Sequence, residues 1–334
     1  MANMTNSILS LPDSDQPDLL TSLAQEFKEA FEELSGHAQS ELSGKHFVFS
    51  RYGKELYPYF ESTDSDLAPG CIVPLKEGRP VASVDSTCVL VGETPKGALY
   101  AARTAVGLSF DGKLRRFFRL GPLLVYASPD GLEGIPSGSS SPEMQLLLSD
   151  HTVAERVIRN LVEERVIRAI MEEGEEVTVL SDGSLKHPMG AIHASSARNW
   201  RAGNTLVGFS KSSGLIFSER LVGALSKCET PSYYLVDGGP IDSVLAKFSP
   251  QGLVFRLDVP RRGVALERVL GSLLWNDAFS SGYPESLKVA HHLSIFSKAD
   301  DQALKAFVMR RFGLRQVPAF PVRRIALGGF RGGA

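Results

Sequence analysis

The sequence predicts a mixed α/β sheet with helices packed on its faces. Three β-rich segments follow one another closely at residues 81–92, 98–110 and 117–127, which indicates an antiparallel meander. Beyond residue 142, strand-like segments alternate with helical ones, as they do where helices cover a sheet. Of the 334 residues 43% are hydrophobic, so the chain can bury a large core without disulfides or a structural metal.

The region ahead of the sheet contains one strong helical pattern. Pro17 opens this pattern, apolar residues recur in it at intervals of three or four, and Gly36 ends it. Residues 37–78 are mixed, with turn signals near Pro58 and at Pro69–Gly70. We therefore expect a helical and irregular N-terminal addition.

The meander accounts for the next fifty residues. Residues 81–92 (VASVDSTCVLVG) are β-branched and almost continuously apolar, as a buried central strand is. A second strand is expected at residues 98–110, and Asp111–Gly112 forms the turn after it. The third strand is expected at residues 117–127, with a bulge or an edge at Gly121–Pro122.

The second half of the chain alternates between helices and strands. A loop over residues 129–142 leads into a long helix over residues 143–173, and a short strand over residues 178–180 follows. Further strands are expected at residues 205–210, 232–237, 244–249 and 253–259, and further helices at residues 215–227, 263–274 and 284–311.

Charge is distributed unevenly along the chain. Lys and Arg number 36 and Asp and Glu 38, so the net charge of −2 argues against a wholly basic nucleic-acid binder but not against a local basic channel. Residues 1–35 carry a net −6 and residues 301–334 a net +6. These ends could attract each other, or form two solvated helix faces. We divide the chain into an N-terminal region (1–78), a core (79–300) and a basic C-terminal extension packed on the core (301–334).

The cysteines and the apolar segments indicate in which cellular compartment the protein works. Cys71, Cys88 and Cys228 are far apart and odd in number, which favours a reducing environment over a disulfide framework. The N-terminus lacks a signal-peptide pattern, and no run approaches 18 apolar residues. We expect a cytoplasmic protein without a membrane partner.

Two aspartates stand at unusual places in the strand patterns. Asp85 lies inside VASVDSTCVL, where a buried carboxylate is costly unless it is paired or binds a metal. The alternative is a strand that ends earlier and exposes Asp85 in a turn. Asp182 follows the apolar run at residues 177–180, at the kind of strand end where ligand sites collect. An ordinary Asp-Gly turn with Gly183 is its alternative.

The long helix offers a third acid. An apolar stripe that includes Val153 and Leu161 is continued by Glu164, whereas Glu163 points nearly opposite to the centre of this face. We expect Glu164 to face a site, or to pair with a neighbouring arginine of the same helix.

The segment GYPESLKVAHHLS (282–294) offers a histidine and a tyrosine. Pro284 is placed to start a helix, and Tyr283 lies at its entrance. His291 shares the apolar face of this helix better than His292 does. A lone histidine is usually structural, so His291 is a candidate functional residue only if carboxylates lie close to it in the fold.

Three acids and one imidazole make an oxygen-rich set of metal ligands. This set suits Mn²⁺ or Mg²⁺ better than zinc or copper. Paired divalent ions held by carboxylates are a general device for cleaving phosphodiesters, in which one ion activates water and the other stabilises the leaving oxygen.

Six short segments carry a family resemblance. They are VASVDSTC (81–88), the helical glutamate near position 164, VTVLSDGSL (177–185), LVGFSKSS (206–213), FRLDVP (255–260) and GYPESLKVAHH (282–292). In this order and spacing, over about residues 80–300, the chain resembles the NurA family of DNA double-strand-break repair nucleases, which work with the HerA helicase/translocase.

The resemblance implies a fold, an activity and partners. It implies an RNase H-like (Piwi-like) core and a Mn²⁺-dependent exo- and endonuclease on single- and double-stranded DNA, with two ions per site, acting in DNA end resection and break repair. It also implies a homodimer that encloses a DNA channel and docks onto a hexameric HerA ring. The residues that match the family's catalytic and metal-binding positions are Asp85, Glu164, Asp182, Tyr283 and His291. Glu163 is the alternative to Glu164.

The sequence gives weaker signals for the basic residues that would bind DNA than for the metal ligands. Lys211 follows an apolar strand and could hold a phosphate, or it could simply be exposed at a strand end. The channel candidates, which solvated loops would equally explain, are Arg115, Arg116, Arg119, Arg261 and Arg262.

Two other functions fit the same sequence. An actin-like ATPase or sugar kinase also has a related core, and residues 181–185 and 236–240 could be Asp-Gly phosphate turns, although the chain has no P-loop. The other alternative is a catalytically inert DNA-channel adaptor with a decayed site, against which the presence of all four candidate ligands argues.

Overall fold

The computed structural model describes ten stretches of the chain. They are residues 45–52, 55–62, 69–94, 96–128, 131–133, 150–185, 200–210, 219–237, 240–261 and 264–313. The helix expected from Pro17 to Gly36 and the segment after residue 313 lie outside them. The chain divides into two compact units, residues 1–67 with 214–220, and residues 68–213 with 221–334.

The described part of the first unit is mainly a pair of antiparallel strands. β1 (Lys45–Tyr52) pairs antiparallel with β2 (Glu55–Ser62) along its whole length, with Phe47 opposite Phe60. These strands were not expected from the sequence. Pro58, expected near a turn, lies inside β2 opposite Phe49.

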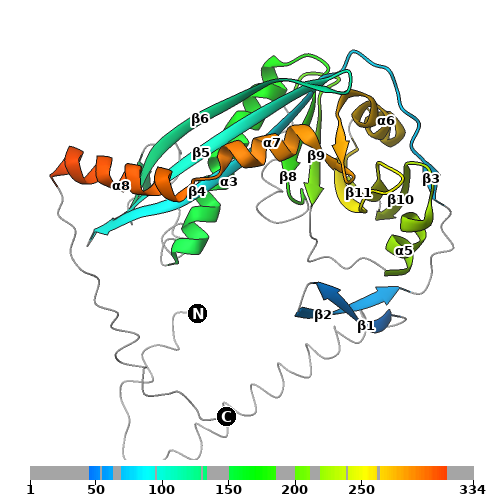
Figure 1. Ribbon diagram of the computed structural model, residues 1–334, viewed down its shortest axis with the longest axis horizontal. Coiled ribbons are helices and arrows are strands. Elements are labelled where there is room, and N and C mark those ends of the chain that lie inside the picture. The colour runs from blue at the N-terminus through cyan, green and yellow to red at the C-terminus, as the bar shows by residue number, and fades with distance from the viewer. Residues whose placement is uncertain are drawn as a thin grey trace, which may run out of the picture. The chain divides into compact units, whose positions relative to one another are not determined.

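The second unit is built on a ten-stranded sheet in the order β3-β10-β11-β12-β9-β8-β4-β5-β6-β7 (Figure 1). The strands are β3 (Gly70–Cys71), β4 (Val81–Thr94), β5 (Gly97–Phe110), β6 (Lys113–Ser128), β7 (Gly131–Glu133), β8 (Thr178–Asp182), β9 (Thr205–Ser210), β10 (Ser232–Asp237), β11 (Ile241–Lys247) and β12 (Phe255–Pro260). The expected mixed sheet is confirmed.

The middle of this sheet has the strand order of an RNase H-like core. β4, β5 and β6 form the predicted antiparallel meander, β8 runs parallel to β4, and β9 runs parallel to β8. The register of β5 and β6 shifts near Gly121–Pro122, where the sequence indicated a bulge. β12, β11 and β10 extend the sheet beyond β9 as antiparallel strands.

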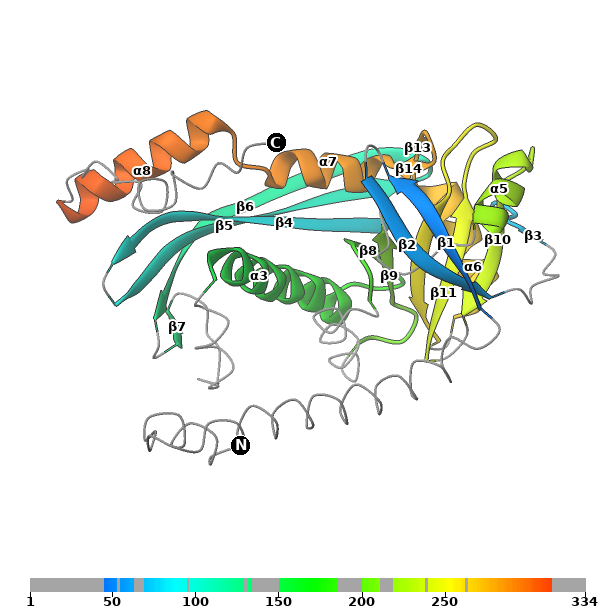
Figure 2. The same cartoon turned by 90° about the horizontal axis from the view of Figure 1, so that it is seen from below.

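Helices cover both faces of the meander (Figure 2). On one face lies α3 (His151–Glu173), whose Ile158 packs with Tyr100 and Ala102 of β5. On the other face lie α7 (Glu285–Ser294) and α8 (Lys298–Phe312). Gly107 of β5 lets α7 lie close to the sheet, because a Cβ there would collide with the carbonyl oxygen of Ser286.

The prediction of a single helix over residues 284–311 is wrong, because the structure has two helices there. The chain leaves α7 at Ile295 and starts α8 after Ser297, whose side chain accepts from the backbone N–H of Asp300. Asp300 in turn accepts from the backbone N–H of Ser297, so the two residues form a capping box. This box satisfies the amides of a new helix start and therefore breaks the helix in two.

The remaining elements flank the strands beyond β9. They are α5 (Glu219–Lys227), α6 (Leu266–Asn276), and a short ladder of β13 (Phe279–Ser280) with β14 (Tyr283–Pro284). Among the helices that the structure describes, none has both the length and the apolar composition needed to cross a bilayer.

Candidate metal centre

Two aspartates lie side by side where a strand ends inside the sheet. β4 and β8 are parallel, and the last pair of their ladder joins Val84 to Ser181, so Asp85 and Asp182 are the next residues on each. β8 ends at Asp182, whereas β4 runs on to Thr94, which leaves a notch in the sheet beside the two carboxylates. Gly183 turns the chain away with φ of +131°, a conformation that favours glycine.

α7 brings a histidine to the same notch. Nδ1 of His291 lies 2.8 Å from Oδ2 of Asp85. One ligand atom from each of Asp85, Asp182 and His291 can be chosen so that all lie within 4.8 Å of one another. Ligands on opposite sides of one divalent ion are about 4–5 Å apart, so the three side chains fit one hard cation. The structure thus brings together three of the residues that the sequence singled out.

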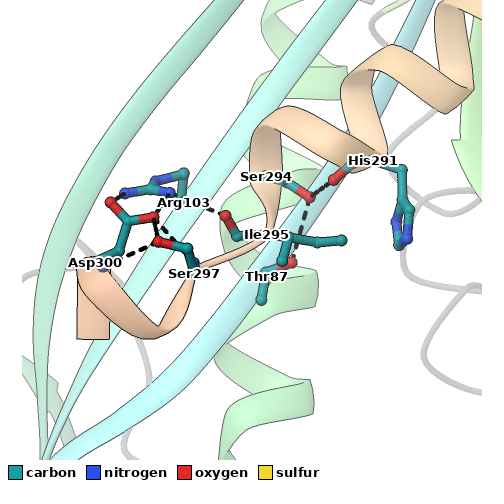
Figure 3. Close-up of polar contacts among 7 residues, drawn as sticks. All are labelled: Thr87, Arg103, His291, Ser294, Ile295, Ser297 and Asp300. Atoms are coloured by element: carbon teal, nitrogen blue, oxygen red, sulfur yellow. Dashed lines mark hydrogen bonds and ion pairs between the residues drawn. The ribbon is translucent and has the colours of Figure 1, made fainter. Parts of the chain in front are cut away.

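A serine fixes the shared aspartate from the end of α7. Ser294 Oγ lies 2.9 Å from Asp85 Oδ2, the oxygen that also contacts His291. The same hydroxyl lies 2.9 Å from the His291 carbonyl oxygen and 3.3 Å from Thr87 Oγ1 (Figure 3). These contacts hold the carboxylate of Asp85 in one orientation at the notch.

On α3, it is Glu163 that faces the strand ends. Its Oε1 accepts a hydrogen bond of 2.7 Å from Ser181 Oγ, and the residue is only 5% exposed. The pKa of Glu163 is raised to about 8, mainly by burial and in part by the negative charges of Asp85 and Asp182. Glu163 is therefore close enough to both carboxylates to feel their charge.

Glu164 is directed differently. Its Oε1 accepts a hydrogen bond of 2.7 Å from Arg168, one turn along the same helix. The expectation that Glu163 points nearly away from the buried face is wrong, because the helix is turned from the assumed stripe. The residues of α3 buried towards the sheet and the strand ends are Ala154, Ile158, Glu163, Ile167 and Met171.

Tyr283 approaches the notch from β14. Its ring packs edge-on against Phe209 at 5.3 Å and against Phe255 at 5.5 Å between ring centres. Burial raises the pKa of its phenol above the usual value, and the charges of Asp182 and Asp85 add to this. The phenol is therefore neutral at working pH and lies within electrostatic reach of both aspartates.

α7 is fastened to the sheet at its first turn. Ser286 donates to Oδ2 of the buried Asp277 and lies 2.5 Å from the hydroxyl of Ser83 on β4. Asp277 also accepts from the backbone N–H of Ala278 at 2.9 Å. Its burial raises its pKa, because charge is costly there.

A buried arginine of β5 fastens the other end of α7 (Figure 3). Arg103 donates to the carbonyl oxygen of Ile295 at 3.0 Å and to the carboxylate of Asp300 at 3.3 Å. Its guanidinium also lies 4.2 Å from the ring centre of Phe296. Sequence reasoning missed Arg103, although an arginine inside the apolar strand ALYAARTAVG was the signal that could have found it.

The predicted basic residues lie elsewhere or outside the described residues. Lys211 and Arg262 are outside them. Arg115, Arg116 and Arg119 are exposed along the first half of β6, and Arg115 donates to the Phe110 carbonyl oxygen. Arg261 follows β12 and pairs with Asp242 at 2.7 Å.

Comparison with known proteins gives structural likeness only. No family model matches the chain, and no curated protein does. A NurA nuclease structure from Sulfolobus solfataricus is 13% identical, covers 92% of this chain and 100% of its own, and has a TM-score of 0.49. A NurA structure with dAMP and manganese is 11% identical, with 91% and 98% covered and a TM-score of 0.45.

A third structure, the catalytic domain of human Endonuclease V, is 13% identical, covers 73% of this chain and 92% of its own, and has a TM-score of 0.37. At these identities and TM-scores the likeness carries no argument about activity or ligands.

Proposed function

We propose that the chain is a divalent-metal-dependent deoxyribonuclease whose site is the notch between β4 and β8. The observation that carries this proposal is the convergence of ligand atoms from Asp85, Asp182 and His291 within 4.8 Å, at the strand ends of an RNase H-like core. Glu163, buried and coupled to both aspartates, is the fourth ligand in this proposal, in place of Glu164.

The proposed chemistry is hydrolysis of a phosphodiester. A divalent ion bound there supplies a polarised phosphate oxygen and a more acidic water. Asp85 and Asp182 hold the ion, and Ser294 keeps Asp85 in the orientation that this requires. Because the pKa of Glu163 is raised to about 8, Glu163 would have to give up a proton to serve as a ligand, and metal binding near neutral pH would release that proton.

His291 and Tyr283 have distinct proposed roles. Since Nδ1 of His291 faces Asp85 and the side chain is 40% exposed, Nε2 can bind a metal or pass a proton to the leaving oxygen. Tyr283 remains a neutral phenol, so its O–H can orient a phosphate oxygen or the attacking water.

We further propose the metal, the DNA substrates, the oligomeric state and the partner from the motifs between residues 81 and 292. This proposal comprises Mn²⁺ with Mg²⁺ as a substitute, two ions per site, exo- and endonuclease cleavage of single- and double-stranded DNA, and a cytoplasmic homodimer that works with a HerA-type hexamer in DNA end resection and break repair. The ordered motif resemblance is its support. Light scattering tests the dimer, and co-purification with a HerA-type protein tests the partner.

A cleavage assay tests the activity itself. Labelled single- and double-stranded DNA are incubated with Mn²⁺, with Mn²⁺ and a chelator, and without metal. We expect cleavage only in the first reaction, and its restoration when excess Mn²⁺ is added to the second. Asp182→Asn should abolish cleavage, whereas Asp301→Asn, a matched change in an exposed ion pair with Lys305, should not. Equal cleavage by both variants would contradict the proposal.

A further inference from the structure

A groove runs along the edge of β4 just beyond the metal centre. Because β8 ends at Asp182 and β4 continues to Thr94, β4 has an edge there that β8 does not cover. The groove has a volume of about 490 Å³. Its wall on β4 is formed by Ser86, Thr87 and Cys88, and its wall on the N-terminal half of α3 by Asp150, Thr152, Val153, Glu155, Arg156 and Arg159.

This groove adjoins the metal centre along both walls. On β4, Ser86 and Thr87 directly follow Asp85 in the strand. On α3, Arg159 lies one helical turn, about 5–6 Å, before Glu163. The positive charge of Arg159 acts on Glu163 and lowers its pKa, which shows that the two side chains are within electrostatic reach.

The two acids of the groove are hydrogen-bonded to backbone amides, whereas its two arginines have no carboxylate partner within the described stretches. Glu155 accepts from the backbone N–H of Leu90 at 2.8 Å, and Asp150 caps α3 by accepting from the backbone N–H of Thr152 at 2.8 Å. By contrast, Arg159 donates to the neutral carboxamide of Asn160. Arg156 is exposed and, within the described stretches of the chain, forms no ion pair.

The lining is suited to a nucleotide rather than to a metal or a redox partner. Burial raises the pKa of the Cys88 thiol to about 12, so this cysteine is a protonated, inert group. The two arginines, Arg156 and Arg159, can contact phosphates of a nucleic-acid strand. A volume of about 490 Å³ is that of a pocket for one small ligand, which matches a short piece of a single strand.

We propose that this groove binds the part of one DNA strand that flanks the scissile phosphate, with Arg156 and Arg159 contacting its phosphates. The inference rests on the proposed nuclease function, which it deepens by assigning a place for the strand on one side of the metal centre. The groove then aligns the phosphodiester with Asp85 and Asp182, and it does so without reading base sequence.

The test measures binding apart from cleavage. A fluorescent single-stranded DNA of about 12 nucleotides is titrated in Ca²⁺, at several salt concentrations, by anisotropy. The salt slope is the change in the logarithm of the binding constant with the logarithm of the salt concentration, and each lost phosphate contact should reduce its magnitude by about 0.7. The Arg156→Gln/Arg159→Gln double variant should therefore lose about 1.4 of this slope and bind the strand roughly tenfold more weakly. Arg165→Gln, the same charge change on the same helix but outside the groove lining, is the matched control and should keep the wild-type slope.

Two further measurements keep the outcome decisive. Thermal unfolding of the double variant should match that of the wild type. Because Arg159 acts on Glu163, Mn²⁺ affinity is compared for the exposed Arg156→Gln variant alone, which should keep the wild-type affinity and lose about 0.7 of the salt slope. The proposal is overturned if the groove variants keep the wild-type slope, if Arg165→Gln loses as much, or if the wild type does not bind the strand. Failure of the wild type to cleave DNA in Mn²⁺, with the slope changes as predicted, would instead reject the nuclease function and leave the groove.

Discussion

The neighbouring acids Glu163 and Glu164 permit a sharp test, because the same substitution has opposite expected effects at the two positions. The pKa of Glu163 is raised from an ordinary 4.5 to about 8, mainly by burial. The folded protein therefore keeps a proton that the unfolded chain releases, and its stability falls as pH rises from 4.5 to about 8. At about 1.4 kcal/mol per pH unit, the whole window costs about 5 kcal/mol of unfolding free energy.

Glu163→Gln removes this charge while keeping the shape and an oxygen for Ser181. In the metal-free protein, we expect the pH dependence in that window to flatten and the variant to be several kcal/mol more stable than the wild type above pH 8. Glu164→Gln is the matched control. It loses a pair with the half-exposed Arg168, worth about 0.5 kcal/mol, and should keep the wild-type pH profile.

The assay is urea unfolding from pH 4.5 to 9 in chelator, repeated with Mn²⁺. With metal, the wild type and Glu164→Gln should gain stability, whereas Glu163→Gln should gain little because it lacks a ligand and its Mn²⁺ affinity falls at least tenfold. Parallel pH profiles for the two variants would refute the assignment of Glu163. Loss of Mn²⁺ binding in Glu164→Gln alone would restore Glu164 as the ligand.

Three further outcomes follow from the supports of the site. Ser294→Ala, which frees one side of Asp85, should weaken Mn²⁺ binding by calorimetry about tenfold with little change in the melting temperature; unchanged affinity would remove Ser294 from this role. Arg103→Lys keeps the charge but loses the forked contacts to Ile295 and Asp300, so it should lower both the melting temperature and the Mn²⁺ affinity. Tyr283→Phe should keep the fold and lower the cleavage rate about tenfold with metal affinity unchanged, and a wild-type rate would contradict its role.

The parts of the site that sequence could predict are those fixed by strand patterns. Asp85 interrupts a run of apolar residues that continues after it, and Asp182 follows such a run, so both could be placed at strands in advance. Their adjacency follows from the parallel pairing of β4 with β8, which is set by strands about ninety residues apart and is not encoded in either local pattern.

The helical parts were harder to predict for a physical reason. A helix turns by 100° per residue, so an error of one position in choosing the buried face of α3 is enough to select Glu164 in place of Glu163. The face of α3 that meets the sheet is chosen by Ile158, Ile167 and Met171, which pack with strands distant in sequence. The break between α7 and α8 was readable in principle, since Ser297 and Asp300 have the spacing of a capping box.

The central claim is that Asp85, Asp182 and His291 hold a metal ion. Crystals soaked in Mn²⁺ and measured for anomalous scattering test it directly. The account predicts a peak at the notch between β4 and β8, at roughly 2.0–2.6 Å from oxygens of Asp85 and Asp182, with Glu163 drawn into its coordination. No peak there at a Mn²⁺ concentration that supports DNA cleavage, or a peak held by other residues alone, would contradict the account.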